Sequence, residues 1–293
     1  MTRPAAFTRQ GPDRLRPAAR WLAVLLVPFL VVASVLLYLF PTRTEVLFAW
    51  TIAPPLSALF LACAYIGGIW FFARVARETR WHRVHRGFVA VLVFASLLLV
   101  ATLLHWDRFH QGTFIFAVWA TLYVTTPFLT AAVLWLHRGV DSGRPEERDY
   151  LLPGGVRAVL VAVGLAALAA GLALFLFPVQ FGQSWAWDLT PLTARVVGTV
   201  LTLPGMVNLF LVRDARWSAF REVFQAQIVS LAFILLALVL GRDALTGPGA
   251  VPVVAGLCVS FLAYVTFYVY CERRRRRAPD RPRRNAPHTS PAG

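Results

Sequence analysis

The chain has 293 residues, of which 58% are hydrophobic, and it carries a formal net charge of +15 at neutral pH. Several apolar runs reach about 20 residues, the length at which a helix crosses the hydrocarbon core of a bilayer. A soluble domain does not bury that many such runs, and a spanning barrel is excluded because the runs do not alternate with a period of two. The composition therefore predicts an all-α, polytopic membrane protein.

All of the positive charge is arginine, with 29 Arg and no Lys. The arginines flank apolar runs and are not interleaved with aromatic residues, which favours the positive-inside bias of a membrane protein over nucleic-acid binding. The run Arg273–Arg277 is expected to bind anionic lipids at the cytoplasmic face. No nucleic-acid partner is expected, and the sequence leaves the oligomeric state open.

In chain order, residues 1–20 are rich in Arg, Pro and Ala, and we expect a disordered, basic cytoplasmic tail. The first apolar run begins at Trp21 and is too long for the core of a signal peptide, so we interpret it as an uncleaved span. Eight transmembrane helices are predicted, at residues 21–40, 55–73, 87–104, 113–136, 158–177, 191–212, 223–240 and 250–270.

The longest internal loop separates two halves of four spans each. Residues 21–138 form the first half and residues 157–272 the second, and the polar segment 139–156 is predicted to be a cytoplasmic linker. Residues 273–293 are rich in Arg and Pro and are expected to form a disordered cytoplasmic tail.

An internal repeat relates the two halves. The stretch 49–58 returns in related form as 186–194, with Pro54 as the one residue without a counterpart. The shift is 137 positions before Pro54 and 136 after it, and residues 77–81 match residues 213–217 at the shift of 136. Four spans per half is an even number, so both halves point the same way, and the sequence predicts two parallel four-helix repeats.

The distribution of arginine predicts the orientation. On one side of the predicted spans lie 25 of the 29 arginines, including those of both terminal segments, and 4 lie on the other. This asymmetry places both termini in the cytoplasm, and we expect a multi-pass protein of a bacterial-type plasma membrane, the inner membrane.

Two tryptophans mark the repeated stretch. Trp50 and Trp187 precede helices that are predicted to start at Pro55 and Pro191, with Thr190 as the N-cap of the second. Tryptophan suits the membrane interface, which indicates a device that anchors the helix entry. The alternative is that the two rings line outward-facing vestibules that bind a ligand.

The second copy of the stretch carries two charges that the first copy lacks. Arg195 falls inside the predicted span, where an unpaired guanidinium is costly. Asp188 lies seven positions earlier, and we expect it to be the partner of Arg195. The alternative is that Arg195 holds an anionic head group or substrate at the outer leaflet.

Asn208 lies near the centre of the sixth span. An asparagine at that depth is expected to bond a neighbouring helix or to line a pathway, and Gln225 and Gln227 in the seventh span invite the same interpretation. The candidate ligand-binding residues are therefore Trp50, Trp187, Asp188, Arg195 and Asn208.

The loop residues His105, Asp107 and His110 are a weak metal candidate, and polar residues at the membrane interface would give the same pattern. None of the six histidines lies deep in a span, which disfavours haem, and no cofactor is expected. Motifs of hydrolases and ATP-driven pumps are missing from the sequence, so an enzyme is not the favoured class.

Three function classes remain. A protein that binds or passes a small or lipidic ligand needs a cavity between the halves that reaches Asp188 and Arg195. A structural or assembly partner needs a packed interior and an outer face of small residues, such as the Ala- and Gly-rich segment 164–171. A metal-dependent membrane enzyme needs His105, Asp107 and His110 to converge on one point.

Overall fold

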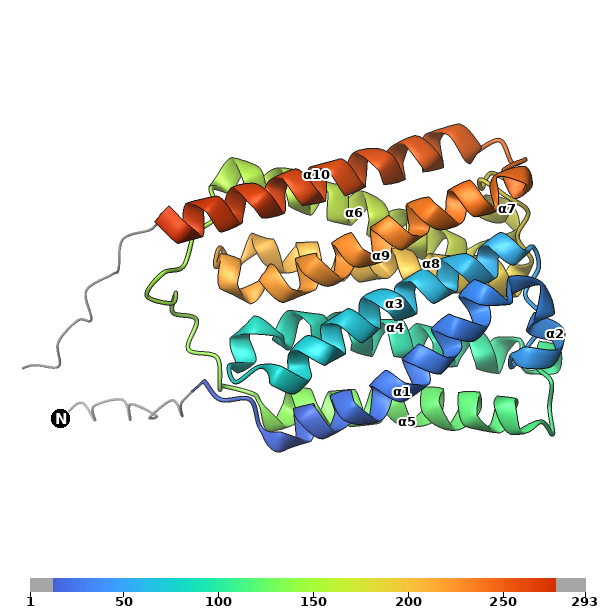
Figure 1. Cartoon of the computed structure of the whole chain (residues 1–293), viewed down its shortest axis with the longest axis horizontal. Coiled ribbons are helices and arrows are strands. Elements are labelled where there is room, and N and C mark those ends of the chain that lie inside the picture. Colours follow the sequence, from blue (N-terminus) through green and yellow to red (C-terminus); the bar gives the residue numbers. More distant parts are fainter. Residues whose placement is uncertain (1–12, 278–293) are drawn as a thin grey trace, which may run out of the picture.

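The computed structural model describes residues 13–277, and within them eight long helices run side by side (Figure 1). They are α1 (Pro17–Leu39), α3 (Pro55–Arg77), α4 (His85–Leu104), α5 (Phe114–Leu136), α6 (Gly154–Leu176), α8 (Pro191–Leu209), α9 (Arg221–Leu240) and α10 (Ala250–Arg277). Each of these helices is long and apolar enough to span a membrane, which confirms the eight predicted spans. The fold is that of an all-α integral membrane protein.

The loops gather at two ends of the bundle, which differ in chemistry (Figure 1). The basic end holds the α3–α4 loop, the α5–α6 linker, the α8–α9 loop and the arginines of α10. The aromatic end holds the short helices α2 (Thr44–Leu47) and α7 (Pro178–Gly182) and the α4–α5 and α9–α10 loops.

Proline and threonine set the helix starts at the aromatic end. Pro55 and Pro191 are the first residues of α3 and α8, where the missing N–H has no helical partner in any case. The Thr190 hydroxyl accepts a hydrogen bond from the Thr193 N–H at 3.2 Å, which confirms the predicted N-cap.

The helix ends at the basic end extend beyond the predicted spans. Helix α1 begins at Pro17 rather than Trp21, and the Arg20 guanidinium donates to the Glu78 carbonyl at 2.8 Å. Helix α10 continues to Arg277 rather than Tyr270, because arginines at a helix C-terminus interact favourably with the helix dipole. The remainder of the two predicted tails, 1–12 and 278–293, lies outside the described residues.

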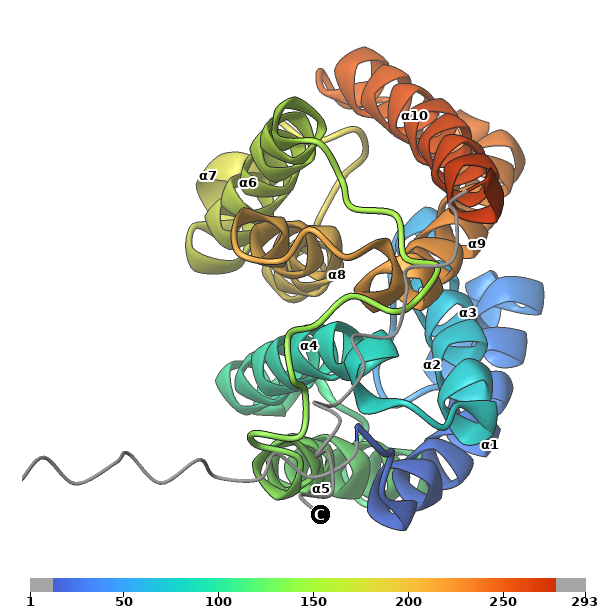
Figure 2. The ribbon, with the colours of Figure 1, turned by 90° about the vertical axis from the view of Figure 1, so that its left-hand side faces the viewer.

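Helices α3, α4, α8 and α9 form the inner part of the bundle (Figure 2), and α3 and α8 are the most buried of the eight long helices. Helix α1 packs on α3, and α6 packs on α8, whereas α5 and α10 pack on α4 and α9. The two sets of four helices meet where α3 contacts α9 and α4 contacts α8. Buried residues make up 72% of the most apolar stretch of α3 but 6% of that of α10, so α10 lies at the periphery.

Glycines allow α6 and α8 to cross closely. A Cβ atom added at Gly198 would lie 2.5 Å from the Gly171 carbonyl oxygen, and one added at Gly171 would lie 2.6 Å from the Gly198 carbonyl oxygen. Small residues are the usual means by which membrane helices approach, since lipid offers no hydrophobic drive for their association.

We expect Gly198→Leu to lower the free energy of unfolding by about 1–3 kcal/mol, because the added side chain has to separate α6 from α8. Gly256→Leu on α10 is the matched control, since a Cβ there meets no atom within 4 Å. Thermal unfolding of the purified protein in detergent measures both variants. Equal stability of Gly198→Leu and Gly256→Leu would contradict the close approach.

Candidate functional site

An apolar cavity of about 240 Å³ lies in the middle of the bundle, and all eight long helices contribute to its wall. It lies at the meeting of the two sets of four helices, which is one of the two conditions of the ligand-binding interpretation, but it does not meet the other condition, which is to reach Asp188 and Arg195. No charged side chain of the described residues lines it, and Asp188 and Arg195 are not part of the wall. The cavity therefore offers an apolar surface with a few neutral polar groups.

The two sides of the cavity differ in side-chain size. The first-half side, lined by α1, α3, α4 and α5, carries large aromatic residues, among them Phe71 and Phe94. The positions 136 residues later, on the side lined by α6, α8, α9 and α10, carry Val207 and Ser230. At these two positions the second-half side has the smaller side chain, and one of them adds a hydroxyl, whereas Gly67 corresponds to the larger Leu203.

Most polar groups in the wall already have partners. The hydroxyls of Tyr65 and Tyr123 lie 2.8 Å apart, and the Ser230 hydroxyl donates to the Cys63 carbonyl at 2.9 Å. Gln227 differs, because its amide nitrogen and oxygen are both buried and neither has a hydrogen-bond partner in the described part of the chain.

The predicted tryptophans are buried at the aromatic end, with exposed fractions of 2% for Trp50 and 1% for Trp187. The Trp50 ring lies 4.8 Å from the ring of Trp119, and the Trp187 N–H donates to the Ser57 hydroxyl at 2.8 Å. Neither ring lines the cavity. The Trp187 contact joins the α7–α8 loop to α3 and so connects the two halves.

The predicted ion pair between Asp188 and Arg195 is wrong. The Arg195 Nη1 donates to His105 Nε2 at 2.7 Å, whereas Asp188 is exposed and makes no ion pair with Arg195. Helix α8 begins only at Pro191, so Asp188 lies outside the helical register that the prediction assumed. Burial and the adjacent guanidinium lower the pKa of His105, which keeps its ring neutral and able to accept.

Asn208 bonds two neighbouring helices, as one of its predicted roles requires. Its amide nitrogen donates to the Leu160 carbonyl at 3.0 Å and to the Tyr264 hydroxyl at 3.1 Å, which ties α8 to α6 and α10. Its side chain is not part of the cavity wall.

The three residues of the weak metal candidate face different partners. His105 accepts from Arg195, and Asp107 pairs with Arg108 at 3.2 Å. His110 Nδ1 lies 3.0 Å from a backbone carbonyl oxygen, that of Phe48. No group of three His, Cys, Asp or Glu side chains suited to a metal ion occurs between residues 13 and 277. The geometric condition for a metal enzyme at this loop is therefore not met.

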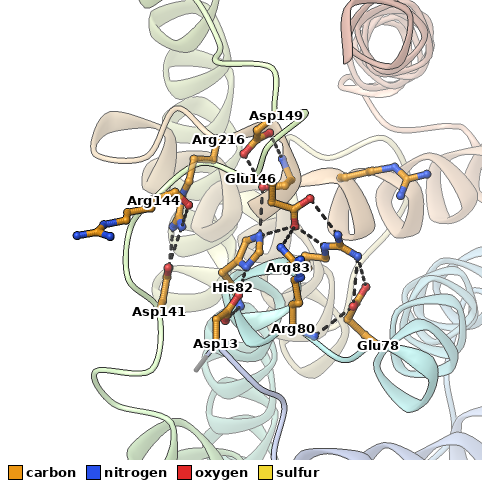
Figure 3. Close-up of polar contacts among 12 residues, drawn as sticks. Asp13, Glu78, Arg80, His82, Arg83, Asp141, Arg144, Glu146, Asp149 and Arg216 are labelled. Atoms are coloured by element: carbon orange, nitrogen blue, oxygen red, sulfur yellow. Dashed lines mark hydrogen bonds and ion pairs between the residues drawn. The ribbon is translucent and has the colours of Figure 1, made fainter. Parts of the chain in front are cut away.

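The basic end holds an ionic network that joins four segments of the chain (Figure 3). The segments are the stretch before α1, the α3–α4 loop, the α5–α6 linker and the α8–α9 loop. The network comprises Asp13, Glu78, Arg80, His82, Arg83, Asp141, Glu146, Asp149, Arg216 and Ser218.

His82 lies at the centre of the network and is 3% exposed. Its Nδ1 contacts the Asp13 carboxylate, and its Nε2 lies 3.0 Å from a Glu146 oxygen and 3.2 Å from the Ser218 hydroxyl. Burial by itself would lower the pKa of His82, but the two carboxylates outweigh it and raise the pKa to about 9. The imidazolium form therefore joins three segments at neutral pH.

We expect the stability of the protein to fall in mild alkali because of this histidine. Its pKa is raised in the folded state from 6.5 to about 9, so its contribution is fully present below pH 6.5 and is lost as the pH rises through about 9. The expected loss is on the order of 2 kcal/mol. Thermal unfolding in detergent at pH 6.5 and at about pH 9 measures this loss of stability. His82→Gln should remove most of the pH dependence of the unfolding temperature. If the stability of the wild type depended on pH as little as that of His82→Gln, the charged His82 ring would not be what joins the three segments.

Sequence reasoning singled out Gln227 but missed its neighbour Ser230. A signal for both was present, since a glutamine and a serine three positions apart lie on the same face of an otherwise apolar helix. No residue spacing in the sequence predicted the ionic network, because its members come from loops that are far apart in the chain.

Comparison of the chain with protein-family models, with curated proteins and with solved structures finds no match. The functional argument therefore depends on the geometry of this chain alone.

Proposed function

We propose that the protein binds or passes a small or lipidic ligand in the cavity between two parallel four-span repeats, and that it does so in a bacterial-type plasma membrane. The observation that carries the proposal is the cavity itself, because its wall draws on all eight long helices. A purely structural bundle gains nothing from a void at its centre, since every unfilled volume forfeits packing contacts.

The helix boundaries support the repeat. Helices α3 and α8 begin 136 residues apart, and so do α4 and α9, and α5 and α10. The contacts between the halves are also related by the repeat. Helix α3 packs on α9, and their counterparts α8 and α4 pack on each other. The His82 ring meets the hydroxyl of Ser218, the residue 136 positions later, which is where a twofold axis would place equivalent side chains.

The arginine distribution supports an orientation with the basic end in the cytoplasm, where anionic lipids attract it. The arginines at the end of α10 would then lie at the level of the head groups. Reporter fusions at Gly143 and at the C-terminus test the arrangement, and both are expected on the cytoplasmic side. Opposite sides for the two fusions would contradict parallel repeats.

Ligand binding is tested by filling the cavity. Ser260 of α10 lines the cavity, whereas the adjacent Val259 faces outward and is 66% exposed. Native mass spectrometry of the detergent-purified protein is expected to show a retained molecule in the wild type and in Val259→Phe. In Ser260→Phe the occupied fraction should fall at least tenfold, because the ring takes the volume of the ligand. Equal occupancy in the two variants would contradict a ligand in this cavity.

A role in assembly is the second candidate, favoured by one observation. The outer face of α10 is apolar and largely exposed, with Val251 at 79% and Leu262 at 64%. Lipid covers such a face in a monomer, and a partner helix would cover it in a complex. The same native spectra distinguish the two, since an assembly partner would add the mass of a protein rather than of a small molecule.

A further inference from the structure

Helices α6 and α10 stand apart at the edge of the bundle (Figure 2). In the other half, α1 makes a few contacts with α5, whereas contacts between α6 and α10, the corresponding pair in the proposed repeat, are sparser. The Asn208 amide bridges α6 and α10 at Leu160, one turn from Val163. The wall of the cavity reflects this difference. Leu26 of α1 closes the first-half side and is 4% exposed, whereas Val163 of α6, which lines the second-half side, is 42% exposed.

We interpret the exposed part of the wall at Val163 as an opening of the cavity between α6 and α10. This opening faces the hydrocarbon of the bilayer, because Val163 lies within the apolar span of α6, away from both loop ends. A molecule that enters there moves sideways from the membrane and needs no aqueous path. This route suits a molecule that is dissolved in the bilayer.

Gln227 of α9 supplies a polar contact in the wall of the cavity. Val91, which lies 136 positions before Gln227, also lines the cavity. At this pair of aligned positions, only the second-half side carries an amide. Its neighbour Gln225 has partners for both amide atoms, since it donates to the Tyr268 hydroxyl at 2.6 Å and accepts from the Trp70 N–H at 3.2 Å. Both amide atoms of Gln227 are without a partner in the described residues. Because an unpaired buried amide is unfavourable, a molecule that both donates and accepts would be held there.

Charge and volume restrict the occupant further. An ionised head group would find no counter-charge in the wall, because the described lining residues include no Arg, His, Asp or Glu. The volume of about 240 Å³ exceeds the apolar cavity of about 150 Å³ that holds benzene in another protein, and it falls below the ~300 Å³ of the smallest drug-sized pockets. One chain segment fits this space, whereas two acyl chains and a phosphate do not.

From these observations we infer that the cavity takes up a neutral single-chain lipid, with a hydroxyl or amide that pairs with Gln227, through the opening between α6 and α10. The inference depends on the proposed function, because it names the ligand class of the same cavity. Ser260 and Tyr264 of α10 also line the cavity, and the Tyr264 hydroxyl accepts a hydrogen bond from Asn208, so Ser260 is the residue that adds a hydroxyl to this wall.

The test uses the full chain in detergent and two photoreactive probes, a long-chain primary alcohol and the alkane of equal length, each with a diazirine in the chain. Peptide mass spectrometry is expected to find both probes on α6, α9 and α10. Gln227→Leu should weaken binding of the alcohol about tenfold and leave the alkane unchanged. The control Gln225→Leu should leave both probes unchanged, and Gln227→Val, which copies Val91, serves as a second variant if the first does not fold.

The outcomes separate the inference from the proposed function. Unchanged alcohol binding in Gln227→Leu would overturn the role of the amide while leaving a ligand cavity in place. Displacement of the alcohol by a two-chain phosphatidylcholine, or a dimer that covers α6 and α10 without a bound chain, would overturn the single-chain lipid. Failure of both probes to label the cavity would overturn the single-chain lipid, and the same failure together with native spectra that show no retained molecule would overturn the proposed function itself.

Discussion

Arg216→Leu is expected to lower the free energy of unfolding by about 3–5 kcal/mol, the largest effect among the variants considered. The Arg216 guanidinium is buried and pairs with two carboxylates, with Nη2 at 2.7 Å from Asp214 and 2.6 Å from Asp141. These contacts hold the pKa of both carboxyl groups below the usual range, although burial alone would raise it. Leucine would leave Asp141 without its guanidinium partner, whereas Asp214 would keep Arg86 at 2.9 Å.

The matched control is Arg213→Leu, three positions earlier in the same loop. The Arg213 side chain is exposed, and an exposed substitution is expected to change stability by no more than about 0.5 kcal/mol. Thermal and denaturant unfolding in detergent measure both variants. If Arg213→Leu and Arg216→Leu were equally stable, the ionic network would not hold the basic end together.

Arg74→Leu is expected to cost about 2–4 kcal/mol, because it removes the main partner of the buried Glu222. The Arg74 Nε lies 2.5 Å from a Glu222 oxygen, and this pair joins α3 of one half to α9 of the other. Arg221 retains one contact with Glu222 at 3.4 Å, so the loss stops short of a fully unpaired charge.

A double variant separates the ion pair from the packing of the two helices. Arg74→Leu with Glu222→Leu should be more stable than Arg74→Leu alone, because no unpaired carboxylate remains, with an interaction energy of about 1–3 kcal/mol. Arg77→Leu, at an exposed position one helical turn further on, is the control. Strict additivity of the two substitutions would contradict a direct pair between the halves.

The sequence predicted the helices well where the local chemistry restricts the boundary. Proline at Pro55 and Pro191 marked helix starts that the structure reproduces. Arginine-rich boundaries were less predictable, since arginine is tolerated both inside a helix and in the head-group region, and α10 continues through five of them to Arg277.

The candidate site was only partly predictable. The sequence predicted that a ligand cavity would lie between the two halves, and Gln227 was noticed as a polar residue in an apolar span. The partner of Arg195 was not predictable from local spacing, because His105 lies 90 residues away and reaches it only through the packing of α4 on α8. The proposed opening between α6 and α10 is likewise a matter of packing between helices, which the periodicity of the sequence does not encode.

The most direct test of the account is an experimentally determined structure of the protein in a lipid nanodisc. We expect a single elongated density that enters between α6 and α10 and ends within hydrogen-bonding distance of the Gln227 amide. A structure in which α10 lies against α6 and side chains fill the central space would contradict the account.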